Sequence, residues 1–377
     1  MSYTGIYTGP APYQQLAEVL RRELDEGRHF PGMQISSERE LGRQHNLSRM
    51  TVRKAVQLLV DEGLVERKPG VGIFVRDRDS ETRVVNMMAG NLSWEPAVRI
   101  SRAARDVARE HGIALQLNDA QGRIDDDLTA IRRLPASGAR GAIIMSLHCP
   151  PFFRALSELR VAGFPFVVVD QHLREIDAPS VASDNQAGGR LIGQHLVEVG
   201  HRQIAFLGDL EADTTQDRLL GLRERLAEAG YPLNPRLIAD VQGQDRFGDW
   251  LPEVETAVIK LMQRQRRPTA LVCSCDAVAR SVYRVLARLK LRIPQDISVT
   301  GFDDDPLAEW LSPGLTTIQQ QFSQIGRVAM ELLLQRIVNP ALPAEHRALP
   351  VKLIERKSVA APITEKPKRR ARVARSA

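Results

Sequence analysis

The sequence predicts an α/β protein made of two parts that are built differently. Residues 1–76 contain short amphipathic helices and end in a pair of strands. Residues 83–360 alternate apolar strand-like runs with helical stretches, which is the pattern of parallel sheets covered by helices on both faces. The chain has 377 residues, more than one ordinary hydrophobic core holds, so two or three domains are expected.

Composition narrows the class of protein. Hydrophobic residues make up 43% of the chain and charged residues 26%, which is a globular composition. No run of about 18 apolar residues occurs, and the N-terminus lacks a basic patch followed by an apolar core, so neither a membrane span nor a secretory signal is expected. The sparse cysteines (Cys149, Cys273 and Cys275) disfavour a disulfide framework and favour the reducing cytoplasm.

Most of the positive charge lies at the C-terminus. The formal net charge is +6, and residues 361–377 alone contain six Lys or Arg against one acidic residue. This basic segment has no apolar pattern around which to fold, so we expect a disordered tail. It either adds sequence-independent affinity for DNA or only solubilises the chain.

Three helices are expected in the N-terminal part. The first stops at Gly27, and its apolar residues at helical spacing are Tyr13, Leu16, Ala17, Leu20 and Leu24. A second, short helix starts at a capping box formed by Ser37 and Glu40. A third helix is capped by Ser48 and reaches about Asp61.

The third helix is expected to have one apolar and one cationic face. Its buried stripe is predicted to be Val52, Ala55, Val56 and Leu59. Arg49 and Arg53 lie one turn apart and away from that stripe. The planar guanidinium of arginine can bond guanine O6 and N7 together, so this face suits the major groove of DNA. The alternative is a charged face that is only solvated, with Lys54 as an ordinary surface lysine.

A β-hairpin follows the third helix. Residues 64–67 and 72–75 are predicted strands, and they are joined by the basic, glycine-bearing tip Lys68-Pro69-Gly70-Val71. A narrow wing of this kind can reach the minor groove. The order of helices and hairpin therefore predicts a winged helix-turn-helix over residues 1–76.

Residues 11–76 resemble the DNA-binding domain of the GntR family. The pieces SERELG, LSRMTVRKAV, DEGLV and GVGIFV fall in the order and spacing of that family, although Ser36 and Ile73 stand where proline and threonine are usual. The resemblance implies double-stranded operator DNA as a partner. The contact residues that it implies are Arg39, Ser48, Arg49, Thr51 and Arg53 in the major groove or on its phosphates, and Lys68 and Gly70 at the wing tip.

A polar, charged linker over residues 77–82 leads into the larger part. Strands are expected there over residues 84–88, 113–117, 142–145, 166–169, 204–207, 271–272 and 297–300. Helices are expected between them, among others over 99–110, 186–199, 218–229 and 276–290. A part of this length suits two lobes with a cleft between them.

Polar side chains follow several of these strands. Asp170, Asp276 and Asp303 each come directly after a strand-like run, and Arg218 opens a helix. Ligands of open α/β sheets bind beyond the carboxyl ends of strands. Carboxylates and arginine make directional bonds to hydroxyl-rich ligands, and Trp250 offers an apolar face suited to a sugar ring.

Residues 83–359 resemble the effector domain of LacI-type regulators and periplasmic sugar-binding proteins. The motifs that carry the resemblance include VASDNQAGGRLIGQHLVEVGHRQIAFLG, PTALVCSCDAVA, IPQDISVTGFDD and LSPGLTTIQQ, in this order. It implies a two-lobe periplasmic-binding-protein-like fold that binds a sugar or sugar derivative. The ligand-binding residues that it implies are Asp170, Arg218, Trp250, Asp276, Asp303 and Gln320, with Asn91, Ser93 and Trp94 on the other lobe. Cys275 stands where a polar residue, often Asn, is usual, which leaves the identity of the sugar open.

Some of these polar residues have structural alternatives. Asp184 and Asn185 are expected to brace the crossover between the lobes. Asp303 and Asp304 are either ligand-binding residues or helix-cap and interlobe residues, with the ligand role favoured more for Asp303. Trp250 is either a sugar platform or a core residue.

Neither a cofactor nor a metal is expected. Cys273 and Cys275 form a Cys-x-Cys without a second paired motif, and His195 and His201 lie at a helix and its end. No GxSxG elbow and no GxxxxGK[ST] phosphate loop occurs. An enzyme that acts on a sugar is therefore disfavoured.

The two resemblances together predict a ligand-responsive transcription regulator, most often a repressor in such families. Ligand binding would alter the spacing of the two DNA-binding domains of a homodimer, which bind a pseudo-palindromic operator. The rival class is a solute-binding protein of a sugar transport system. The missing secretory signal and the N-terminal helix-turn-helix disfavour that rival.

Overall fold

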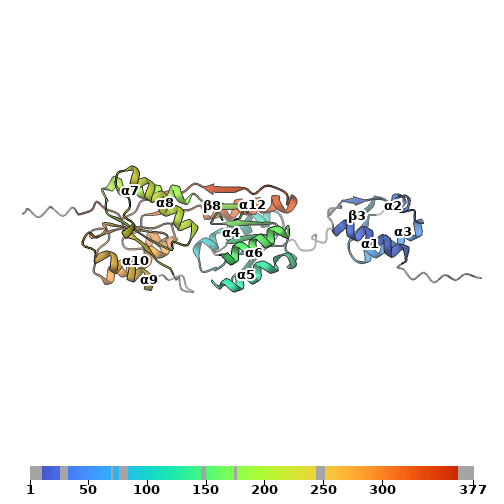
Figure 1. Cartoon of the computed structure of the whole chain (residues 1–377), viewed down its shortest axis with the longest axis horizontal. Helices are drawn as coiled ribbons and strands as arrows, with labels where there is room; N and C mark the ends of the chain where they lie inside the picture. Colours follow the sequence, from blue (N-terminus) through green and yellow to red (C-terminus); the bar gives the residue numbers. More distant parts are fainter. Residues whose placement is uncertain are drawn as a thin grey trace, which may run out of the picture. The chain divides into compact units, whose positions relative to one another are not determined.

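The structure is a computed structural model in which the chain forms two compact units, divided between Arg83 and Val84 (Figure 1). It describes residues 11–25, 33–68, 71–75, 84–145, 150–173, 176–242 and 251–363. Several features predicted above lie outside these described residues, namely Gly70, Cys149, Trp250, the linker over 77–82 and residues 364–377 of the tail.

The N-terminal unit has the predicted helices followed by the predicted hairpin. Its elements are α1 (Pro12–Asp25), β1 (Gln34–Ile35), α2 (Glu38–Gln44), α3 (Arg49–Asp61), β2 (Val65–Lys68) and β3 (Gly72–Val75). The strands form an antiparallel sheet in the order β1-β3-β2. The short strand β1 was not predicted, because two residues carry no readable alternation.

Local sequence signals place α2 and α3 as expected. The Ser37 hydroxyl accepts a hydrogen bond from the Glu40 backbone N–H at 3.3 Å, and the Glu40 carboxylate accepts one from the Ser37 N–H at 2.8 Å. The Ser48 hydroxyl likewise caps α3 by accepting from the Thr51 N–H at 3.2 Å. These bonds satisfy backbone donors that a helix start leaves without partners.

The first lobe of the larger unit is a parallel sheet with helices on both faces. Its strands, in spatial order, are β14 (His346–Leu349), β8 (Ser180–Ser183), β7 (Phe166–Val169), β6 (Ala142–Met145), β4 (Val84–Met88) and β5 (Ala114–Asn118). Its helices are α4 (Glu95–Glu110), α5 (Ile124–Arg133), α6 (Pro150–Val161) and α12 (Phe322–Val338).

The two faces of this sheet have separate cores. Met87 packs in the core under α4 and α12, whereas its neighbour Met88 packs in the core under α5 and α6 (Figure 1). Successive side chains of a strand point to opposite faces, so one apolar run serves both cores.

The second lobe repeats this architecture. Its parallel strands, in spatial order, are β10 (Ile238–Asp240), β9 (Ile204–Gly208), β11 (Ala270–Cys273) and β12 (Ser298–Thr300). Its helices are α7 (Asn185–Val199), α8 (Asp213–Glu228), α9 (Leu251–Met262), α10 (Asp276–Arg288) and the short α11 (Pro306–Trp310). α7 and α8 pack on one face, and α9 and α10 on the other.

The chain passes between the lobes more than once. It crosses after β8 into α7, and returns after the short strand β13 (Thr317–Gln319) into α12. It crosses again after β14 into β15 (Lys352–Ile354), which pairs antiparallel with β13. Residues near these crossings, such as Asn185 and Gln320, therefore lie where the lobes join.

Among the residues that the structure describes, no helix combines the length and apolarity that a membrane crossing requires.

Candidate DNA-contacting face and effector site

α3 presents its two predicted arginines outward. Arg49 and Arg53 are exposed, and neither forms an ion pair with a described residue. The opposite face is fully buried against the core of the N-terminal unit through Val52, Ala55, Val56 and Leu59. The predicted stripe is thus confirmed, and the two guanidinium groups are available to a duplex.

Other predicted DNA contacts lie around the start of α3. Arg39 is exposed on α2, and Ser48 is exposed as the N-cap of α3. The hydroxyls of Ser48 and Thr51 lie 2.8 Å apart and share a hydrogen bond. The partial positive charge of a helix N-terminus suits a phosphate, so this end of α3 can hold DNA backbone while its arginines reach bases.

The wing is attached to α3 by Arg67, which the sequence reasoning missed. Its guanidinium donates to the Gln57 side chain at 2.8 Å, to Glu38 at 3.1 Å and to the Arg53 carbonyl at 3.2 Å. Lys68, the predicted wing-tip contact, is exposed and lies 3.1 Å from the Glu66 carboxylate. The sequence does show a cation within the predicted strand at Arg67. The residues that it contacts are distant in the sequence, so the sequence alone does not reveal them.

In the second lobe, Arg218 is held from several directions. It is 7% exposed, and it donates to the Asn185 side chain at 2.8 Å and to the Ser274 carbonyl at 2.6 Å. Its guanidinium lies 3.9 Å from the centroid of the Phe302 ring and 3.9 Å from the Asp303 carboxylate. These contacts fix the plane and position of the cation.

Asp303 and Gln320 lie together beside Arg218. The Gln320 amide donates to the Asp303 carboxylate at 2.6 Å, while the Gln320 Oε1 is buried without a partner among the described residues. Asp303 has φ of +128°, a backbone conformation that non-glycine residues rarely adopt. Burial raises the pKa of Asp303 to about 6, and the positive charge of Arg218 opposes part of this rise.

Asp170 faces this group from the first lobe. Burial raises its pKa to about 7, Arg218 opposes the rise, and the negative charge of Asp303 adds to it. Its Oδ1 is buried without a hydrogen-bond partner among the described residues. The carboxyl ends of both sheets therefore meet in one group of three ionisable side chains and one amide, which we call the interlobe cluster: Asp170, Arg218, Asp303 and Gln320.

Asp276 lies deeper than the interlobe cluster. It is buried, and its carboxylate accepts the Thr317 hydroxyl at 2.6 Å and the Asp305 backbone N–H at 2.9 Å. A Cβ atom at Gly301 would lie 2.0 Å from its Oδ1. Both oxygens thus tie the start of α10 to β13 and to the start of α11, and this geometry favours a bracing function over direct ligand contact.

Further polar residues near the crossings also bond within the protein. Asp304 accepts from Arg356 at 2.7 Å and from Gln319 at 2.8 Å. Asp184 caps α7 through the Ala187 N–H at 2.9 Å, and Asn185 accepts from Arg218. These contacts agree with the structural alternative for Asp184, Asn185 and Asp304.

The predicted residues of the first lobe follow β4. Asn91 is buried, and its side-chain oxygen accepts from the Ser93 N–H at 2.8 Å. Ser93 is exposed, whereas the Trp94 Nε1 is buried without a partner among the described residues. Asp127 of α5 lies beside them and was missed, because the run Asp125-Asp126-Asp127 looks like a solvated helix start.

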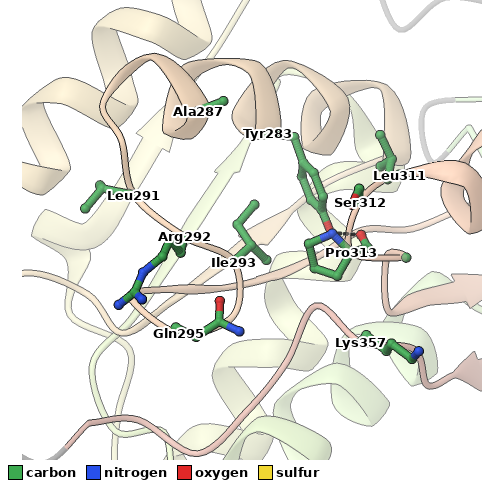
Figure 2. A pocket seen from close by; sticks show the side chains of 11 residues that line it. Tyr283, Ala287, Leu291, Arg292, Ile293, Gln295, Leu311, Ser312, Pro313 and Lys357 are labelled. Carbon is green, nitrogen blue, oxygen red and sulfur yellow. Dashed lines mark hydrogen bonds between the residues drawn. The ribbon is translucent and has the colours of Figure 1, made fainter.

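A separate pocket of about 670 Å³ lies in the second lobe (Figure 2). Its walls come from α10, the loop that precedes β12 and the loop that follows α11, and the Tyr283 hydroxyl donates to the Pro313 carbonyl at 2.9 Å (Figure 2). No residue of the interlobe cluster lines it. Although the pocket is large, it is therefore separate from the candidate effector site.

Two family models match the chain. The model of bacterial regulatory proteins of the gntR family matches residues 12–75, and that of the periplasmic binding protein-like domain matches residues 194–359. Both matches agree with the resemblances described from the sequence.

Relatives with both parts are also found. The arabinose metabolism transcriptional repressor of Geobacillus stearothermophilus is 30% identical over 86% of this chain and 91% of its own length. The repressor of the same name from Halalkalibacterium halodurans is 28% identical over 86% of this chain and 89% of its own length. Among solved structures, a LacI family transcriptional regulator from Enterococcus faecium with bound ribose has a TM-score of 0.63 at 26% identity, and the match covers 74% of this chain and 99% of that one.

Proposed function

Because the chain belongs to the family of GntR-type transcription regulators that carry a periplasmic-binding-protein-like domain, we propose that it is a repressor whose operator affinity is changed by a small sugar. One observation carries the DNA-binding half of the proposal: α3 is packed through one face and presents Arg49 and Arg53 on the other. The sugar is proposed from the interlobe cluster and from the names of the relatives.

On the DNA side, the recognition helix is α3. Arg49 and Arg53 read base edges in the major groove, while Arg39, Ser48 and Thr51 hold phosphates. Lys68 and Gly70 place the wing against the adjacent backbone or minor groove. Arg67 is a positioning residue, since it joins the wing to both helices.

On the effector side, the sugar binds between the lobes. Asp170, Arg218, Asp303 and Gln320 supply charged and amide groups for its hydroxyls, with Asn91, Ser93 and Trp94 on the first lobe and Trp250 as a ring platform. Asp276 acts indirectly, because its oxygens already bond Thr317 of β13 and the backbone of Asp305. Gln320 lies at a crossing, so ligand contact there can bias the angle between the lobes.

Coupling of sugar binding to operator binding requires two N-terminal units, one from each copy of the chain. A homodimer places two α3 helices on successive major-groove sites of a pseudo-palindromic operator, and lobe closure changes their spacing. A sugar can shift this balance only through its different affinities for the two states. The protein acts in the cytoplasm, where its operator is, and a role as a transport solute-binding protein leaves the N-terminal unit without a use.

The DNA-binding test compares two arginine variants. Arg49→Ala with Arg53→Ala is expected to lower affinity for DNA from upstream of the protein's own operon by at least tenfold, because each bidentate base contact contributes about 1–3 kcal/mol. Arg22→Ala is the matched control, since Arg22 is exposed on α1, which packs on the opposite side of α3. Fluorescence anisotropy with labelled duplex measures the affinity.

Equal affinity of the double variant and the control for operator DNA would reject α3 as the recognition helix. The same protein is screened with sugars by thermal shift, because a ligand that binds the folded form raises its melting temperature. A regulator that no sugar stabilises and that binds all DNA sequences equally would contradict the proposed function.

A further inference from the structure

Asp127 is a buried carboxylate that lacks a hydrogen-bond partner in the part of the chain that the structure describes. It is 2% exposed, and neither of its carboxylate oxygens has a hydrogen-bond partner among the described residues. Burial raises its pKa to about 6, and the charges of Asp119 and Asp126 add to the rise. Buried polar groups are nearly always paired, so a carboxylate left in this condition points to a missing partner.

The local sequence does not explain this burial. Asp125 and Asp126, the preceding residues of α5, are exposed, whereas Asp127 lies on the buried side with Leu128 and Ile131. An apolar side chain at this position would pack there without the energetic cost of removing a carboxylate from water. The helix N-terminus favours a negative charge, but within the described ranges it supplies no donor to either oxygen of Asp127.

The position of Asp127 in the fold is where α/β sheets bind ligands. Strands β4 and β6 are neighbours, and the chain leaves them toward helices on opposite faces, α4 and α6. Such a point opens a crevice at the carboxyl ends of the strands. A Cβ atom at Gly90, which follows β4, would lie 3.7 Å from the Asp127 Oδ2 and equally far from the carbonyl of Met145, the last residue of β6.

Unfilled hydrogen-bonding groups gather around this point. The Trp94 ring also comes within 3.7 Å of the Cβ position at Gly90, and its Nε1 is a buried donor without a described partner. In register, Met145 pairs with Val169, which immediately precedes Asp170. Neighbouring strands lie about 4.8 Å apart, so Asp127 and Asp170 border the same edge of the sheet.

We infer that Asp127 is a specificity-determining residue of the effector site, whose carboxylate accepts hydrogen bonds from hydroxyl or ammonium groups of the bound effector. The inference rests on the proposed function and deepens it, because it states which chemistry the effector presents to the first lobe. With Asp127 and Asp170 on one edge, that end of the ligand is a neutral polyol or an amine. A phosphate or carboxylate there would meet further acceptor oxygens, and the negative charge of Asp127 would repel it.

The test uses the full-length protein and two substitutions in one helical turn. Asp127→Asn removes the charge and one acceptor oxygen with little change of shape, and Asp125→Asn makes the same chemical change at an exposed position. The probes are arabinose, ribose, glucosamine and arabinose 5-phosphate. Calorimetric titration measures their affinities, and thermal melting is followed with and without each probe.

Two results are expected. Asp127→Asn lowers the affinity for the best neutral or amine probe by tenfold or more, while Asp125→Asn leaves it unchanged, and arabinose 5-phosphate binds wild-type protein at least tenfold more weakly than arabinose. Without any probe, Asp127→Asn melts at the same temperature as wild type or higher, because it removes an unpaired buried charge.

Equal probe affinity in Asp127→Asn and wild type would overturn the inference, as would tighter binding of the phosphate. A lower melting temperature of Asp127→Asn without probe would also overturn it, since that is the behaviour of a structural carboxylate. If the proposed function itself is wrong, the result differs, because no probe stabilises the wild-type protein. In that case the melting comparison without probe still shows whether Asp127 is a structural carboxylate, which would overturn the inference independently.

Discussion

Asp170 of the first lobe interacts electrostatically with Arg218 and Asp303 of the second lobe. It directly follows β7 and has φ of +71°, and its Oδ1 lacks a partner among the described residues. Burial raises its pKa, and the positive charge of Arg218 in the second lobe opposes this rise. Asp303 on the facing lobe has the same combination of positive φ and burial. Strained, desolvated groups of this kind gather at binding sites, where the ligand supplies what the fold leaves unfilled.

The raised pKa of Asp170 has a consequence for stability. The folded protein holds this proton up to pH of about 7, whereas an unfolded Asp loses it near pH of about 4. The stability that protonated Asp170 contributes is therefore fully present at low pH and is lost as pH rises through 7. Asp170→Asn, which does not ionise and tolerates positive φ, is expected to gain melting temperature relative to wild type as pH rises from about 4 to about 7, the window between these two pKa values.

Thermal melting of both proteins across this pH range measures the effect. Asp106→Asn, an exposed change on α4, serves as the control and should follow wild type throughout. A constant difference between Asp170→Asn and wild type would mean that Asp170 is already ionised in the folded protein at low pH.

At the scale of elements, α7 and α8 approach so closely that glycine is required. A Cβ atom at Gly221 of α8 would lie 1.9 Å from the Gln186 carbonyl oxygen of α7. A Cβ atom at Gly189 of α7 would lie 2.0 Å from the Arg218 carbonyl oxygen. Because these contacts involve backbone atoms, no side-chain rotation relieves them, and the pair sets where Arg218 stands.

Gly221→Ala is expected to separate the two helices. The overpacking should lower the free energy of unfolding by about 1–3 kcal/mol and abolish sugar-induced stabilisation, because Arg218 moves with α8. Leu220→Ala, at the neighbouring exposed position, should retain sugar-induced stabilisation. Denaturant unfolding and thermal shift measure the two effects, and a Gly221→Ala protein that binds sugar normally would show that Arg218 is positioned by other contacts.

Element prediction from the sequence succeeded where the pattern was long. The stripe of α3 and the caps Ser37 and Ser48 were found because period and capping depend on residues a few positions apart. The strands β1, β8, β10, β13, β14 and β15 were not predicted. They have two to four residues each, and their pairing depends on distant segments, as when Gln319 lies opposite Lys352.

For the whole molecule, the proposed coupling is reciprocal. If a sugar lowers operator affinity by some factor, bound operator must lower sugar affinity by the same factor, because both describe one equilibrium between two states. We expect equal factors when anisotropy is measured with and without the sugar that gives the largest thermal shift, and when that sugar is titrated with and without operator duplex. Unequal factors would contradict a single equilibrium shared by the DNA-binding and effector parts.

The architecture and the exposed, arginine-bearing face of α3 were determined by the sequence alone. Apolar periodicity, capping residues and the order of motifs are local properties, so they can be read without coordinates. The outward position of Arg49 and Arg53 follows from the spacing of the apolar residues of α3, which place the buried stripe on the opposite face: Val52, Ala55, Val56 and Leu59.

Only the tertiary structure decided which carboxylates are free to meet a ligand. Asp276 and Asp304 follow strands just as Asp303 does, yet Thr317 and Arg356, distant in sequence, occupy their oxygens. Asp127 looks like its exposed neighbours until α5 packs against the sheet. The physical reason is that burial and hydrogen-bond partners are set by contacts between distant segments, whereas residue type and spacing are not.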